Sequence, residues 1–135
     1  MHRAILLLAL LCGLGITANA QGNAAVFYGY HNDRQFVFTI TPELLDSSPD
    51  WEEGQDNPPL PARRALEAAA TYLPQLVPNA EEWHSMEIRL VPVNKKWVYV
   101  VGFSEQKERL SSKFVIVVLM NGRVVDPKIN ERKTL

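Results

Sequence analysis

Histidine, serine and carboxylate side chains are the groups in this sequence that could do chemistry, and their spacing matches no known catalytic motif. His31 and His84 have no second histidine four residues away and lie in no His-Glu-x-x-His pattern, so they indicate no zinc site. No serine stands in the Gly-x-Ser-x-Gly pattern that exposes a nucleophile. Carboxylates are abundant, which leaves a small carboxylate-based hydrolase as an alternative. The sequence otherwise predicts no catalytic residues, no metal site and no cofactor.

The densest group of acids lies between Pro42 and Pro61, a stretch with five prolines and no basic residue. Its carboxylates are those of Glu43, Asp46, Asp50, Glu52, Glu53 and Asp56. Calcium loops of the EF-hand type need regularly spaced oxygen ligands, a central glycine and a closing glutamate, and these acids do not meet that spacing. We expect a solvated acidic loop with one short helical turn at 43–46. Trp51, its single aromatic residue, either packs the loop onto the core or stands exposed as a binding anchor.

Aromatic side chains also indicate where a partner could bind. Trp83 and His84 are adjacent at the start of an expected strand, and with Trp51 they form the candidate binding surface. The basic and aromatic residues at 95–99 resemble a platform for single-stranded nucleic acid. Their alternation is more typical of a packed strand. The formal net charge of −1 also argues against phosphate binding, so we expect no nucleic-acid partner.

A sheet must position these residues, and residues 95–103 predict its central strand. Trp97, Tyr99 and Phe103 would share one face, because successive side chains of a strand point to opposite sides. The other face, which includes Val98, is apolar as well. A strand that is apolar on both faces belongs in the middle of a sheet. We therefore expect its aromatic side chains to lie buried beneath a helix, closed to any ligand.

The remaining chain predicts one helix and several further strands. An apolar stripe at spacings of three and four residues predicts a helix from Ala62 to Leu76. Strands are expected at 24–30, 35–41, 83–93, 113–120 and 123–125. The fold class is then α+β, with one main helix packed on a curled antiparallel sheet of about four to six strands. A single domain would span 21–127, followed by a polar tail at 128–135 that frays.

The first 20 residues have the three regions of a secretory signal peptide. A positively charged start is followed by an apolar run of 13 residues and by small residues at Ala18 and Ala20. This pattern predicts cleavage before Gln21. Spanning a membrane takes roughly 20 apolar residues, so we expect no membrane span. Lipid attachment at Cys12 is an alternative fate of the same segment.

Export decides where we expect the protein to work. Cleavage before Gln21 would remove Cys12, the one cysteine of the chain. A small secreted domain of a eukaryote is more often stabilised by disulfide bonds. We therefore expect a bacterial protein in the periplasm or outside the cell.

Three segments resemble a PepSY-type domain: the alanine-rich 65–69, the aromatic and valine-rich 97–101, and 118–125 with its Asn-Gly turn. The resemblance covers about residues 58–127, and the chain has Asn94 where the family usually has a glycine. It implies a cystatin-like fold and, as in some relatives, a proposed role in restraining peptidases. It implies no catalytic residues.

Together these features predict an exported, noncatalytic binding module that takes a protein or peptide through a sheet edge. The edges that we expect to be open are the return strand at 123–125 and the first hairpin. The alternative is a structural envelope protein that pairs with itself through such an edge, as a homodimer.

Overall fold

The computed structural model describes residues 22–105 and 114–132. The predicted signal-peptide features, Ala18, Ala20, Gln21 and Cys12 among them, lie outside the described residues.

The first sheet has three antiparallel strands in the order β1-β2-β6. β1 (Ala25–His31) and β2 (Arg34–Ile40) form the expected hairpin, and β6 (Lys128–Glu131) pairs with the other side of β2. Asn32 and Asp33 close the hairpin with φ of 46° and 58°. Positive φ at both central residues is what a tight turn needs to match the twist of the flanking strands.

The second sheet has the order β3-β4-β5, again antiparallel. β3 (Trp83–Val93) and β4 (Lys96–Glu105) are joined by a tight turn in which Asn94 has φ 54°. β5 (Phe114–Leu119) pairs with the other side of β4. The central position expected for residues 95–103 is confirmed.

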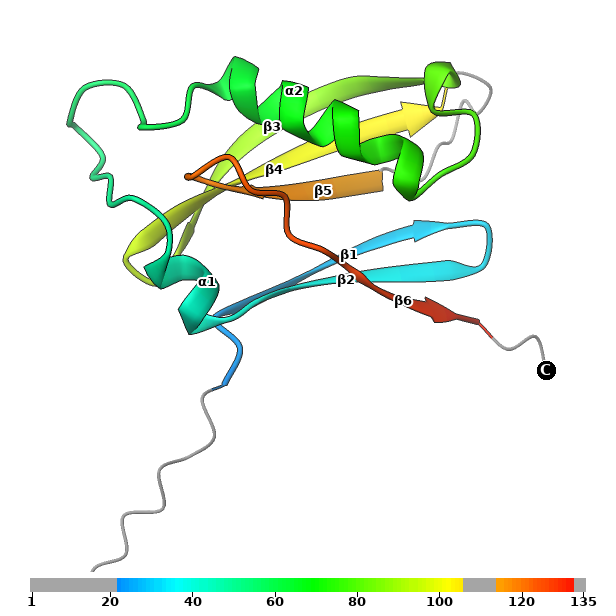
Figure 1. Ribbon diagram of the computed structural model, residues 1–135, viewed down its shortest axis with the longest axis horizontal. Coiled ribbons are helices and arrows are strands. Elements are labelled where there is room, and N and C mark those ends of the chain that lie inside the picture. Colours follow the sequence, from blue (N-terminus) through cyan, green and yellow to red (C-terminus); the bar gives the residue numbers. More distant parts are fainter. Residues whose placement is uncertain (1–21, 106–113, 133–135) are drawn as a thin grey trace, which may run out of the picture.

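The described residues also include one main helix and three short helical segments. α2 (Ala62–Tyr72) buries Ala65 and Ala69, and it contacts all three strands of the second sheet (Figure 1). The expected helix continued to Leu76, but the regular helix ends at Tyr72 because Pro74 cannot supply the next hydrogen bond. The short segments are α1 (Pro42–Asp46) and the 3₁₀ turns η1 (Leu73–Gln75) and η2 (Ala80–Glu82).

Two expectations about the C-terminal part are wrong. Residues 128–131, expected as part of a fraying polar tail, form β6, where Ile129 lies opposite Phe36. Backbone hydrogen bonds can hold an edge strand in place even when all its side chains are exposed. The polar composition of residues 128–131 was therefore not sufficient reason to predict a fraying tail. The return strand expected at 123–125 makes only one isolated bridge, Val118 to Val124.

The two sheets meet where β1 contacts β5, so β5 lies between β4 and β1 (Figure 1). Gly29 of β1 allows this close approach, since a Cβ there would lie 3.1 Å from Cε2 of Phe114. Phe114 in turn packs edge-on against Phe36 of β2, with ring centroids 4.9 Å apart. One hydrophobic core therefore joins both sheets and α2. Residues 22–105 and 114–132 form an α+β structure with six strands in two sheets, where the sequence predicted a single curled sheet.

Within residues 22–105 and 114–132, no helix has the length and apolar character needed to cross a membrane.

Candidate binding groove

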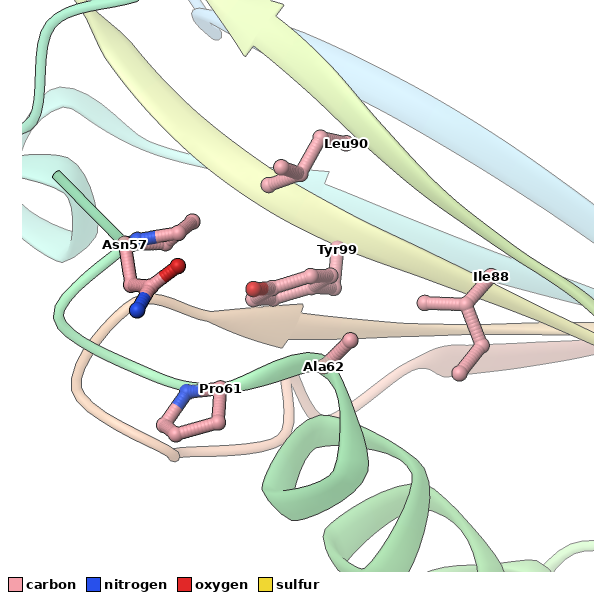
Figure 2. A pocket seen from close by; sticks show the side chains of 7 residues that line it. Asn57, Pro61, Ala62, Ile88, Leu90 and Tyr99 are labelled. Carbon is pink, nitrogen blue, oxygen red and sulfur yellow. The ribbon is translucent and has the colours of Figure 1, made fainter. Parts of the chain in front are cut away.

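A groove of about 570 Å³ opens between the start of α2 and the second sheet. Its walls are formed by Asn57, Pro58, Pro61, Ala62, Ile88, Leu90 and Tyr99. Figure 2 shows Tyr99 between the strand residues Ile88 and Leu90 on one side and Pro61 and Ala62 on the other. No charged side chain lines the groove, so it suits an apolar group.

Tyr99 fixes the shape of this groove. Tyr99 is 2 % exposed, and its hydroxyl donates a hydrogen bond of 2.5 Å to the carbonyl oxygen of Leu60. Burial raises the pKa of Tyr99, so the phenol keeps the proton that it donates. The bond ties the segment before α2 to the centre of the sheet. Tyr99 is thus buried as expected, but it also forms part of a groove, which the sequence had led us to exclude.

The acidic loop is held beside the groove by Trp51, the residue with two alternative readings. Its ring packs edge-on against Trp97, with centroids 5.4 Å apart, and its Nε1 donates to the carbonyl oxygen of Asp56 at 2.8 Å. Lys96 bonds the same loop through the carboxylate of Asp50, with Nζ and Oδ1 2.7 Å apart. The reading in which Trp51 packs the loop onto the body of the protein is confirmed.

β3, which forms one wall of the groove, is the last strand of its sheet. Pro92 of β3 lies opposite Trp97 of β4 and has no N–H to donate, so this pair is of the kind without direct backbone hydrogen bonds. The two kinds of pair alternate along an antiparallel ladder, and the register is uninterrupted from Glu87 to Val93. The backbone N–H and C=O groups of Ile88 and Leu90 therefore point away from β4, toward the outer edge.

This outer edge is open over a short length. No strand or backbone hydrogen bond meets it among the residues that the structure describes. A bulge between Ser85 and Glu87 interrupts the ladder at one end, and Pro92 removes a donor at the other. Both features limit pairing to Glu87–Val91. The groove lies beside this same interval, because Ile88 and Leu90 line it.

The structure does not bring Trp51, Trp83 and His84 together into one surface. Trp51 packs near the start of β4, whereas Trp83 pairs with Glu105 at its end. Trp83 is 9 % exposed, and its ring packs against His31 and Phe114. His84 is exposed and contributes to a different part of the surface from Trp51. A strand rises about 3.3 Å per residue, so the two tryptophans are separated by most of the length of β4.

His84 has one polar neighbour that bears on catalysis, the hydroxyl of Ser104, with Nε2 and Oγ 3.2 Å apart. The two residues are direct cross-strand neighbours in the ladder between β3 and β4, so regular pairing alone brings them together. Neither residue lines the groove beside Tyr99. Among the described residues, no three histidine, cysteine or acidic side chains are placed to hold a metal ion.

Sequence reasoning did not bring together Ile88, Leu90, Pro61 and Ala62 as the walls of a groove. The alternation of β3 predicted its half-buried face, but it could not show that α2 begins far enough away to leave a gap over that face. The available signal was Pro92, because a proline inside a strand indicates an edge.

Comparison with protein families, with curated proteins and with solved structures finds no match to this chain.

Proposed function

We propose that this protein is a noncatalytic binding module that accepts an extended polypeptide strand on the outer edge of β3. The added strand pairs with Ile88 and Leu90 through its backbone and places an apolar side chain in the groove beside Tyr99. The observation that carries this proposal is the coincidence of an unpaired strand edge with an apolar groove along the same few residues. Strand addition gains its affinity from main-chain hydrogen bonds and its specificity from pockets for alternate side chains.

The edges expected from the sequence suit this function less well. β2 is enclosed between β1 and β6, and β1 lies against β5. The segment at 123–125 follows β5, where Val125 donates its N–H to the carbonyl oxygen of Val117 at 2.9 Å. β3 has no such neighbour among the described residues.

A cystatin-like, PepSY-like arrangement is the family that we propose for this binding module. The packing of α2 against an antiparallel sheet supports it. The departure at Asn94 is compatible with it, because φ of 54° lies in the left-handed region that glycine favours and asparagine tolerates. A peptidase whose substrate-like segment adds to β3 is then one partner that the proposal allows.

Export through a cleaved signal peptide also belongs to the proposal, with action in the periplasm or outside the cell. The support is the sequence pattern that ends at Ala18 and Ala20. Intact-mass measurement of the protein recovered from a bacterial periplasm should give a chain that starts at Gln21. A mass that still includes Met1, in a protein found with the cytoplasmic fraction, would contradict export.

Peptide display tests strand addition directly. Peptides selected against the protein should be extended and apolar at alternate positions, and NMR titration should shift the amides of Ile88 and Leu90 most. Leu90→Lys should weaken binding at least tenfold, because it places a charge in the groove. Tyr28→Lys is the matched control, since Tyr28 is 51 % exposed on the first sheet. Equal loss in both variants, or shifts centred elsewhere, would refute the site.

A further inference from the structure

We infer that the strand added to β3 is the β3 strand of a second copy of this chain, arranged around a two-fold axis that passes through Ile88. This inference rests on the proposed function, because it names the partner of the same edge. Two antiparallel copies of one strand always meet around such an axis. The sequence Met86-Glu87-Ile88-Arg89-Leu90 is self-complementary about its centre: apolar at both ends and in the middle, acidic on one side and basic on the other.

The backbone permits this axis. The N–H and C=O groups of Ile88 point outward, so Ile88 and its copy can exchange two hydrogen bonds. Residues on either side then face each other as pairs without direct backbone bonds, the kind in which side chains approach most closely. These pairs join Glu87 of each copy with Arg89 of the other.

The charges favour this register. Within one chain, Oε1 of Glu87 already lies 3.0 Å from Nε of Arg89. Pairing about Ile88 places the same Glu87–Arg89 pair of the second copy beside it, running in the opposite direction. Glu87 of each copy then faces Arg89 of the other, so each charge gains an opposite neighbour across the interface. Opposite charges at facing positions stabilise a strand pair, and like charges destabilise it.

Neighbouring registers are less favourable. An axis through Arg89 would place Arg89 opposite its copy, and an axis through Glu87 would do the same with two carboxylates. An axis through Leu90 would bring Pro92 opposite Ile88 of the second copy and lose a hydrogen bond. The axis at Ile88 is the one among these four that pairs unlike charges.

The apolar side chains agree with the same axis. Met86 is 58 % exposed, the largest exposed fraction among the large apolar residues that the structure describes. Met86 lies in the bulge, just outside the paired interval Glu87–Val91, and the register at Ile88 brings its side chain next to Leu90 of the second copy, at the rim of that copy's groove. An otherwise unexplained exposed methionine thereby gains a partner.

Reversing the charges one at a time tests the interface. Analytical ultracentrifugation should show a concentration-dependent dimer for the native protein. Glu87→Arg or Arg89→Glu alone should weaken it by about tenfold, because two attractive pairs become repulsive. The double variant E87R/R89E should restore it, and a mixture of the two single variants should form a heterodimer. A double variant as weak as the single ones would overturn the inference, since a merely unstable fold would not be rescued by a second reversal.

Failure of this inference can be told apart from failure of the proposed function. A native protein that stays monomeric, while a selected peptide still shifts the Ile88 and Leu90 amides, would overturn the self-pairing and leave strand addition standing. A dimer that is insensitive to both charge reversals would also overturn it. A monomer that selects no peptide would contradict both proposals.

Discussion

Single side chains tie distant parts of this chain together at the residue scale. The hydroxyl of Tyr99 holds the segment before α2, and the hydroxyl of Tyr72 donates to Oδ1 of Asp126 at 2.6 Å, across 54 residues of sequence. Neither partner could be predicted, because a tyrosine pattern shows which face is buried and not which carbonyl or carboxylate the hydroxyl will reach. Tyr99 itself was predicted to be buried.

The Tyr72 bond predicts a loss of stability at alkaline pH. Burial, with the hydrogen bond and negative charge of Asp126, raises the pKa of Tyr72 from 10.0 to about 12. The folded state thus holds the proton more tightly than the unfolded chain, so this contribution is full below pH 10.0 and declines as the pH rises to about 12. Urea unfolding across this range should show a shallower decline for Tyr72→Phe than for the native protein.

Tyr28→Phe removes an exposed hydroxyl and is the control for that series. An alkaline decline of Tyr72→Phe as steep as that of the native protein would show that the bond to Asp126 does not shape the pH dependence.

At the scale of elements, periodicity and turn residues predicted most of the strands and the main helix. β3 has the bounds that the sequence indicated, and β5 begins within one residue of them. The errors fall where backbone pairing decides the structure. All four side chains of β6 are exposed, so no apolar pattern in the sequence marks it as a strand. It is a strand because its backbone pairs with β2. The groove was missed because it depends on the distance between α2 and β3, which no local pattern encodes.

Gly29 is the point where two elements approach most closely, and Gly29→Ala should destabilise the fold by about 1–3 kcal/mol. The added Cβ would lie 3.1 Å from the ring of Phe114, which is fully buried and held edge-on by Phe36. Chemical denaturation measures the loss. Gly22→Ala is the control, because nothing lies within 4 Å of a Cβ there. Equal stability of the two variants would mean that the Phe114 ring can move aside for the added Cβ without a measurable loss of free energy of unfolding.

Ending the chain after Pro127 tests whether β6 is part of the folded unit. Its removal deprives one side of β2 of a hydrogen-bonded neighbour over four paired residues. With a net contribution of roughly 1 kcal/mol per bond and some fraying at an edge, the free energy of unfolding should fall by about 1–3 kcal/mol. An unchanged urea midpoint would support the fraying tail that the sequence suggested.

At the scale of the whole molecule, the two sheets and α2 share one core, and among the described residues β3 and β6 each end a sheet with no strand paired to their outer side. β2 and β4 are paired on both sides, and β5 lies between β4 and β1. β3 combines a free edge with an adjoining groove, and its bulge and proline confine pairing to five residues, Glu87–Val91. An open edge invites association with another chain. Because the bulge and Pro92 leave only Glu87–Val91 able to pair, an added strand can bind in few registers.

Amide hydrogen exchange, followed residue by residue, tests the open edge most directly. In dilute protein, the amides of Arg89 and Val91, which point to β4, should be protected, whereas those of Ile88 and Leu90 should exchange freely. Raising the protein concentration, or adding a selected peptide, should protect Ile88 and Leu90 as well. Protection of Ile88 and Leu90 in the dilute protein, or no gain in protection once binding is saturated, would contradict strand addition at β3.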